Sequence, residues 1–229
     1  MKYIITLPLV LCAVITSAQQ VIDVNNESKT IAFKEMFYNV GGQSAVKYVD
    51  FKNGTPYFKE EWLPASLALN NGKTYEGLQA KLDIMSGGFV YKNEKGTELV
   101  AQAPIKQIVF SDGNNRFVFV NSSSLFSNGS KKIWYQQLQS GKAALYKQLE
   151  KTIVETTPFN SATIEQSIKT TEKYFLQKGQ AIIPVKKTKD ILEALNDQSL
   201  VVQKFSKEKQ ALSERTLVEI ASYYNSLSK

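Results

Sequence analysis

The chain has 229 residues, of which 43% are hydrophobic, and a formal net charge of +7, which together favour a folded core over wholesale disorder. It contains no histidine and a single cysteine, Cys12. This composition excludes Ser-His-Asp triads and Cys-His dyads, and it disfavours zinc, copper and non-haem iron sites. No calcium loop, phosphate-binding loop or dinucleotide-binding glycine motif occurs in the sequence. We therefore expect no cofactor and no tight transition-metal site.

The first eighteen residues are typical of a secretory signal peptide. Lys2 precedes an unbroken apolar run over residues 3–15, and Thr16 and Ala18 supply small residues at −3 and −1 of a cut after Ala18. The run is shorter than the ~20 apolar residues that a transmembrane helix needs. We expect a mature chain over residues 19–229 that is exported to the periplasm or secreted and keeps no transmembrane segment.

A lipoprotein signal ending at Cys12 is the alternative interpretation. That processing requires a small residue before the cysteine, whereas this chain has Leu11 there, and the apolar run continues past Cys12. Cleavage after Ala18 is favoured, and it leaves a mature chain without cysteine and so without disulfides.

The charge surplus of the expected mature chain lies entirely in its second half. Residues 19–120 carry 11 basic and 11 acidic side chains, whereas residues 121–229 carry 16 and 10. Lysine greatly outnumbers arginine, which disfavours nucleic-acid recognition. An envelope protein or an anionic surface is the partner that this half could contact. The densest lysine clusters are Lys186, Lys187 and Lys189, and then Lys204, Lys207 and Lys209.

The stretch before residue 187 reads as an antiparallel β-meander. Four dipeptides, at Asn53-Gly54, Asn71-Gly72, Asp112-Gly113 and Asn128-Gly129, suit tight turns because Asn and Gly tolerate positive φ. Segments rich in alternating or β-branched residues lie between them. The expected strands are 62–69, 74–84, 89–92, 98–102, 105–110, 116–120, 132–138, 143–152, 174–177 and 181–185.

Three segments carry more specific expectations. Alternation over residues 74–84 predicts a half-buried strand, with Leu78, Ala80, Leu82 and Ile84 on one face and Gln79, Lys81 and Asp83 on the other. The serine-rich residues 122–130 are expected to form a polar loop. Residues 155–171 are threonine-rich with weak periodicity, so we expect irregular structure with at most one strand.

The last forty residues change to helical patterns. Thr188, then Asp197 or Ser199, and then Ser213 are suited to cap three short helices. In the third helix, the spacing i, i+3, i+4 and i+7 produces one apolar stripe that should face a core, formed by Leu217, Ile220, Ala221 and Tyr224.

The expected fold class is α+β, mainly β, with a meander that is either a sheet or an open barrel and a short C-terminal helical segment. The organisation that follows is a signal peptide over residues 1–18, a β-rich domain over 19–186, and a helical segment over 187–229 packed on that domain.

Candidate site residues are few. Trp62, Trp134 and Tyr135 could form a sugar-stacking platform, although aromatic residues in β-proteins mostly fill cross-strand pairs. Acid–base chemistry would need paired carboxylates, and each candidate is more simply a solvated or turn-facing acid. These candidates are Glu60, Glu61, Glu76 and Asp83.

Several segments together resemble a group of uncharacterised secreted proteins of the Bacteroidota. They are Ser17-Ala18-Gln19-Gln20, Phe51-Lys52-Asn53-Gly54-Thr55-Pro56-Tyr57-Phe58 with Glu61-Trp62, Asn71-Gly72-Lys73-Thr74-Tyr75-Glu76-Gly77, Leu82-Asp83-Ile84 and Tyr223-Tyr224-Asn225. The resemblance implies a periplasmic or cell-envelope location. It implies no activity and no catalytic residues.

Two functional hypotheses follow. The first is an exported, non-catalytic binding or scaffolding module, because catalytic residue types and motifs are missing from the sequence. The alternative is a periplasmic carrier of an apolar ligand, in which the meander forms an open barrel and the C-terminal helices act as a lid. A cavity lined by apolar side chains would favour the carrier, and a filled core would favour the module.

Overall fold

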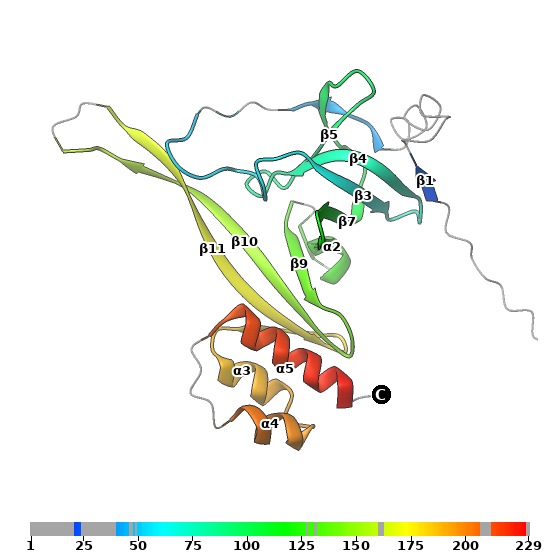
Figure 1. Ribbon diagram of the computed structural model, residues 1–229, viewed down its shortest axis with the longest axis vertical. Helices are drawn as coiled ribbons and strands as arrows, with labels where there is room; N and C mark the ends of the chain where they lie inside the picture. The colour runs from blue at the N-terminus through cyan, green and yellow to red at the C-terminus, as the bar shows by residue number, and fades with distance from the viewer. Residues whose placement is uncertain are drawn as a thin grey trace, which may run out of the picture.

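The computed structural model describes residues 21–23, 40–45, 48, 50–126, 128–130, 132–159, 163–206 and 212–227. The expected signal peptide, Cys12, Lys207 and Lys209 lie outside these residues. The described part is mainly β, with short helices at the C-terminal end (Figure 1). The expected α+β, mainly β fold class is confirmed.

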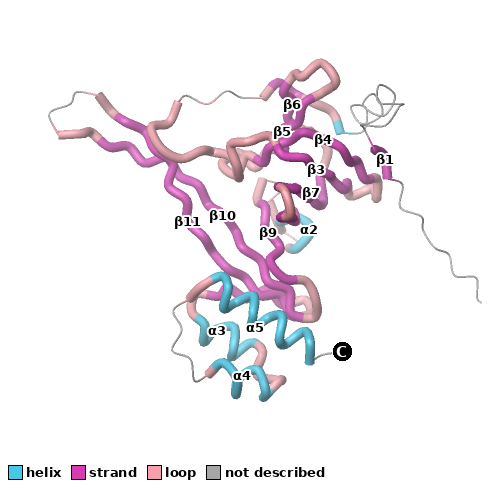
Figure 2. The backbone as a smooth tube through the Cα atoms, viewed as in Figure 1, coloured by secondary structure: helices cyan, strands magenta, loops and turns pink. Residues whose placement is uncertain are grey.

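All strands belong to one open sheet, shown in Figure 2. Along the sheet the order is β12-β11-β10-β9-β8-β7-β3-β4-β5-β6-β2, and β1 pairs in parallel with the first part of β4. The remaining strand pairs are antiparallel, as expected for a meander. The strands are β1 (Val21–Asp23), β2 (Gln43–Ser44), β3 (Leu63–Leu69), β4 (Thr74–Leu82), β5 (Phe89–Lys92), β6 (Glu98–Val100), β7 (Ile105–Asp112), β8 (Asn115–Asn121), β9 (Trp134–Gln139), β10 (Ala143–Thr156), β11 (Glu165–Lys178) and β12 (Ala181–Val185).

Two of the four turn dipeptides connect adjacent strands as predicted. Asn71-Gly72 lies between β3 and β4, which pair along most of their length. Asp112 pairs with Asn115, so the β7–β8 turn has only two residues, and Gly113 there has φ of 57°. The other two dipeptides form no tight hairpin, and Asn128-Gly129 lies in the longer connection between the paired strands β8 and β9. Asn53 instead bridges in parallel to Ser167 of β11, so this segment lies against a strand that follows it by more than a hundred residues.

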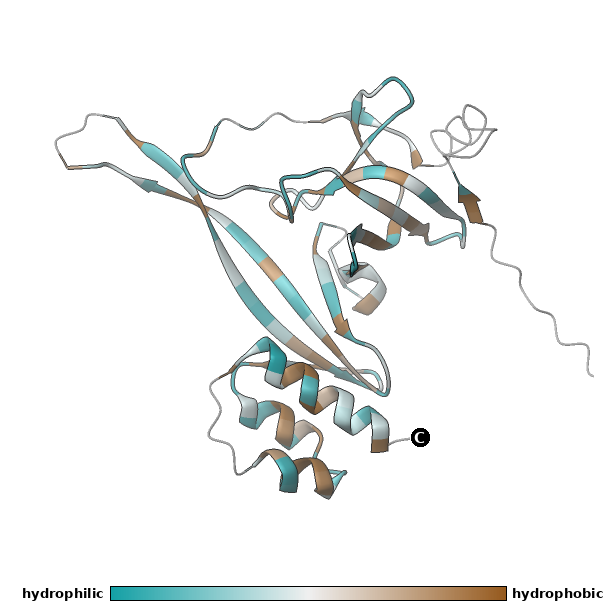
Figure 3. Ribbon diagram, viewed as in Figure 1, coloured by the Kyte–Doolittle hydropathy of each residue, from teal (hydrophilic) through white to brown (hydrophobic). Residues whose placement is uncertain are grey.

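The expectation for residues 155–171, irregular structure with a possible strand, was only partly right, since strand covers more of the stretch than expected. Most of this stretch belongs to a long two-stranded ribbon, in which fourteen residues of β10 pair with fourteen of β11, from Ala143↔Lys178 to Thr156↔Glu165. The outer half of the ribbon contacts the segment 52–57 but buries few of its side chains, and it is largely hydrophilic in Figure 3. A ribbon without a buried face has no reason to show alternating hydrophobicity, which is why the pattern was weak.

Two large apolar clusters and one small one fill the structure. The first lies on β3, β4, β5, β7 and β8, where Tyr75, Phe89 and Phe119 are almost completely buried. The second lies between the base of the ribbon and the helices. The third covers the opposite face of β9 and β10 and contains Tyr135, Ala144 and Tyr146.

The helices are α2 (Ser122–Leu125), α3 (Thr188–Ala194), α4 (Ser199–Phe205) and α5 (Glu214–Leu227). The segment expected to be a polar loop therefore contains a one-turn helix, α2, capped by the side chain of Asn121. Ser213 caps α5 as predicted, since its Oγ accepts a hydrogen bond of 3.2 Å from the backbone N–H of Thr216. In α3 and α4 the capping positions are Lys187 and Gln198, one residue before the expected Thr188 and Ser199.

The apolar stripe on α5 is buried, as the spacing predicted. Leu217, Ile220 and Ala221 are completely inaccessible to solvent, and Tyr224 is nearly so. They pack with Leu145 and Leu176 of the ribbon. The helices thus cover β9, β10 and β12 at one end of the sheet.

Candidate functional site

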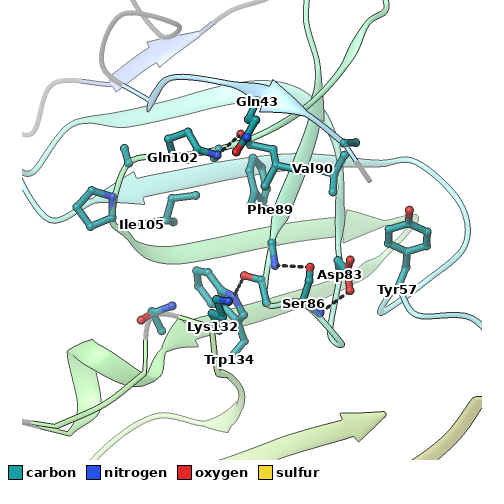
Figure 4. A pocket seen from close by; sticks show the side chains of 18 of the residues that line it. Gln43, Tyr57, Asp83, Ser86, Phe89, Val90, Gln102, Ile105, Lys132 and Trp134 are labelled. Carbon is teal, nitrogen blue, oxygen red and sulfur yellow. Dashed lines mark hydrogen bonds between the residues drawn. The ribbon is translucent and has the colours of Figure 1, made fainter. Parts of the chain in front are cut away.

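A cavity of about 550 Å³ lies at the opposite end of the sheet from the helical segment. Its walls come from β2, β5, the segments 83–88 and 100–105, and the start of β9 (Figure 4). This volume is within the range typical of small-molecule sites. Polar and apolar groups both face it, including Gln43, Tyr57, Asp83, Gln102, Lys132 and Trp134.

Asp83 is the buried carboxylate of this cavity, with only 5% of its surface exposed. The sequence placed Asp83 with Gln79 and Lys81 on the polar face of the strand, but β4 ends at Leu82 and Asp83 begins the turn that follows. Tyr48 Oη donates a hydrogen bond of 2.6 Å to Oδ2, and the backbone N–H of Ser86 donates one of 2.9 Å to Oδ1. These bonds compensate the burial of the charge, and they fit the turn-facing interpretation of this acid.

The backbone of Asp83 also organises the loop that forms one cavity wall. The backbone N–H of Asp83 donates to Gly88 O at 2.9 Å, and the N–H of Gly87 donates to Asp83 O at 2.8 Å. Burial and the hydrogen bond to the Asp83 carboxylate both raise the pKa of Tyr48. The Tyr48 phenol therefore stays neutral and remains a hydrogen-bond donor over the physiological pH range.

The three aromatic residues singled out from the sequence lie in three different environments. Trp134 lines the cavity, but it is only 6% exposed, and its Nε1–H donates a 2.9 Å bond to Gly87 O. Tyr135 points to the other face of the sheet, where its ring packs on Phe126 and Phe175. Trp62 is not among the residues that line the cavity. The three do not form one platform.

Trp62 has two cationic neighbours instead. The ammonium groups of Lys81 and Lys92 lie 5.0 and 4.4 Å from the centroid of its ring. Such cation–π contacts stabilise the two lysines on this face of β4 and β5. Trp62 is thus part of a surface cluster of charged and aromatic residues.

The other candidate acids do not approach Asp83 to form a catalytic pair in the cavity. Glu61 and Glu76 are exposed, and Glu60 is exposed while it contacts Lys81 at 3.7 Å. Of these acids only Asp83 lines the cavity. Within the described ranges, no group of three or more Asp, Glu, His or Cys residues is arranged to hold a metal ion.

A second polar cluster joins α5 to the ribbon, and sequence reasoning did not identify it. Lys147 Nζ lies 2.6 Å from Glu214 of α5 and 3.6 Å from Glu172 of β11. Tyr174 Oη donates a 2.7 Å bond to Glu172, and burial together with this bond raises the pKa of Tyr174. The cluster sits where the helical segment meets the sheet, so its geometry indicates a structural role. The pairing of β10 with β11 and the packing of α5 on them bring these residues together.

The lysine clusters of the C-terminal half are partly neutralised or packed. Lys189 pairs with Glu193 at 3.2 Å, and Lys204 Nζ lies 4.0 Å from the ring centroid of Tyr223. The backbone N–H groups of Lys186 and Lys187 bind the carboxylate of Asp190, which lowers the pKa of that carboxyl. Lys186 and Lys187 are themselves exposed.

In the part of the chain that the structure covers, no helix has the length and apolar character needed to cross a bilayer. Comparison with protein-family models, with curated proteins and with solved structures found no significant match.

Proposed function

We propose that this chain is an exported cell-envelope protein that acts as a non-catalytic binding module for a small hydroxyl-bearing ligand, such as a mono- or disaccharide. The observation that carries the proposal is the cavity of about 550 Å³ beside Asp83. The first apolar cluster fills the rest of this end of the sheet. The cavity is therefore confined to one place and is not the interior of a barrel.

The lining suits a ligand that both donates and accepts hydrogen bonds. Asp83 accepts only, whereas the side-chain amides of Gln43 and Gln102 do both and the ammonium of Lys132 donates. Phe89 and Trp134 add apolar wall area against which the C–H face of a sugar ring can pack. The absence of histidine and of catalytic motifs from the sequence supports binding without turnover.

The carrier alternative has less support. It requires an apolar cavity closed by the C-terminal helices, but none of the residues that line this cavity belongs to α3, α4 or α5. Those helices fill the second apolar cluster against β10 and β11. The charged and amide groups of the lining also oppose an aliphatic ligand.

Intrinsic fluorescence can test the ligand class. The chain has two tryptophans, so a Trp62→Phe protein reports on Trp134 alone. Titration with maltose or N-acetylglucosamine should change its emission saturably, whereas laurate should not. Saturation by laurate only would favour the carrier, and no response to any of the three would reject a small-ligand site for these chemistries.

A matched pair of variants tests whether the change in fluorescence arises from ligand bound in the cavity. Ala103→Phe should abolish it by filling the cavity, since Ala103 lines it. Gln79→Phe, on an exposed position of β4 outside the lining, should leave it intact.

The location is tested separately by intact mass of the exported protein. A mature N-terminus at Gln19 is expected, and a lipid-modified N-terminus at Cys12 would contradict it.

A further inference from the structure

The outer edge of β10 is open along the half of the ribbon that projects from the body (Figure 1). On that edge β9 pairs with β10 only from Leu145 to Gln148. Within the described ranges, no strand pairs with β10 on this side from Leu149 to Thr156. An unpaired edge of this length offers a row of backbone donors and acceptors to another strand.

Exposed apolar side chains occur on this otherwise polar segment and near the end of the hairpin. Ile153 and Val154 are 45% and 39% exposed, and Phe159 and Ile164 near the end of the hairpin are 96% and 61% exposed. On the other strand, the edge of β11 is partly covered, because Lys52 N donates to Gln166 O and Ile168 N donates to Asn53 O, each at 2.8 Å. The uncovered edge is therefore that of β10.

We propose that the β10 edge pairs antiparallel with the same edge of a second copy of this chain, centred on Ile153, to form a two-fold symmetric dimer. In this register Ile153 lies opposite its own symmetry mate, and Lys151 lies opposite Glu155 of the second copy. Because the two-fold axis repeats each contact, the arrangement forms two Lys–Glu pairs flanking an Ile–Ile contact.

Register choice follows from the charges. Shifting the centre to the point between Thr152 and Ile153 would place Glu150 directly opposite Glu155, which is unfavourable. Centring on Thr152 would place Lys151 opposite Ile153 and leave the charges without partners. Only the Ile153 register of these three matches opposite charges.

The state of Lys151 supports this pairing. Its Nζ donates to the backbone carbonyls of Thr55, at 2.7 Å, and Tyr57, and it forms no ion pair with a described carboxylate. Burial lowers the pKa of this lysine. Glu60 and Asp83 oppose this effect of burial without forming an ion pair with Lys151, so a carboxylate of Glu155 from a second copy, which now accepts from Gln166 at 2.8 Å, would give this half-buried cation a direct ionic partner.

Sedimentation velocity of the purified protein over a concentration series tests the proposal. The unmodified protein should show a reversible monomer–dimer equilibrium. Ile153→Lys places two like charges on the axis and should weaken dimerisation at least about tenfold. Lys169→Glu, an exposed charge change on β11 away from the open edge, should leave the equilibrium unchanged.

A charge-swap pair makes the test specific to the register. Lys151→Glu and Glu155→Lys should each weaken self-association, since each places like charges opposite one another. Mixing the two variants should restore a heterodimer, because opposite charges then meet again. Circular dichroism of each variant confirms that it is folded.

Three outcomes would overturn the proposal: a monomer at all concentrations, a dimer unaffected by Ile153→Lys, or two single variants that fail to combine when each is folded. Binding of the monomer to phosphatidylcholine vesicles, lost in Ile153→Lys, would assign the apolar end of the hairpin to a membrane surface instead. Lys151 contacts the carbonyl of Tyr57, which lines the cavity, so the ligand test is made on proteins that keep Lys151 and is separate from the charge-swap pair.

Discussion

The side-chain amide of Asn225 forms two hydrogen bonds of 2.9 Å with the backbone of Ala143, 82 positions earlier in the chain. Oδ1 accepts from the Ala143 N–H, and Nδ2 donates to the Ala143 carbonyl. Nδ2 also donates to Ser140 O at 3.1 Å. Asn225 thus fastens the last turn of α5 to the β9–β10 connection and satisfies backbone groups there.

Replacing Asn225 by alanine should therefore destabilise the protein by about 1–3 kcal/mol, because backbone groups of Ala143 lose their partners in a half-buried place. Urea unfolding measures the change. Ser226→Ala, at the next and exposed position, is the control and should stay within about 0.5 kcal/mol of wild type. Equal effects of the two variants would show that the hydrogen bonds of the Asn225 side chain contribute no stability.

Ile220→Asp should destabilise the protein by about 3–5 kcal/mol, because Ile220 is completely buried and its replacement must bury a carboxylate or undock α5. Ser222→Asp, on the exposed side of the same helix, should have little effect. The melting temperatures of wild type and the two variants, measured by thermal unfolding, test this expectation. Melting of Ile220→Asp within a degree or two of wild type would contradict the packing of α5.

Gly87→Ala should cost about 2–4 kcal/mol, clearly more than Gly96→Ala. Both glycines have positive φ, 74° and 76°, so both substitutions carry similar backbone strain. A Cβ at Gly87 would lie 2.0 Å from Lys132 O, whereas one at Gly96 meets nothing within 4 Å. The difference between the two unfolding free energies therefore isolates the close approach of the 83–88 loop to Lys132, and equal values would deny it.

Alkaline pH should destabilise the fold through Tyr91. Burial raises the pKa of its phenol to about 12, and its Oη donates a 2.8 Å bond to Gly41 O. In the unfolded chain this tyrosine ionises near its ordinary pKa of about 10. The contribution of Tyr91 to the free energy of unfolding is therefore complete below that pH and is lost as pH rises toward about 12.

Urea unfolding at several pH values checks this expectation. The free energy of unfolding should fall above about pH 10, and it should fall less steeply in Tyr91→Phe. Tyr223→Phe, in the second apolar cluster, is the control. An identical slope in Tyr91→Phe and wild type would show that Tyr91 does not contribute.

The sequence by itself was enough to predict the helices and strands that bury one face, because their apolar residues recur at regular spacing. The stripe on α5 predicted its packing because a helix that buries one face must repeat apolar residues at helical spacing. The strands of the first apolar cluster were predicted from the corresponding alternation of apolar residues. Short turns such as Asp112-Gly113 indicated which of these strands pair.

The tertiary structure alone decided the features that depend on distant partners. The outer halves of β10 and β11 bury no face, so hydrophobic periodicity could not reveal them. Asp83 looked like an exposed strand residue, and it became the buried acid of the cavity because Tyr48 and the 83–88 loop supply its hydrogen bonds. Trp62, Trp134 and Tyr135 share a residue type, but side-chain alternation along β9 and the path of the sheet send them to three different surroundings.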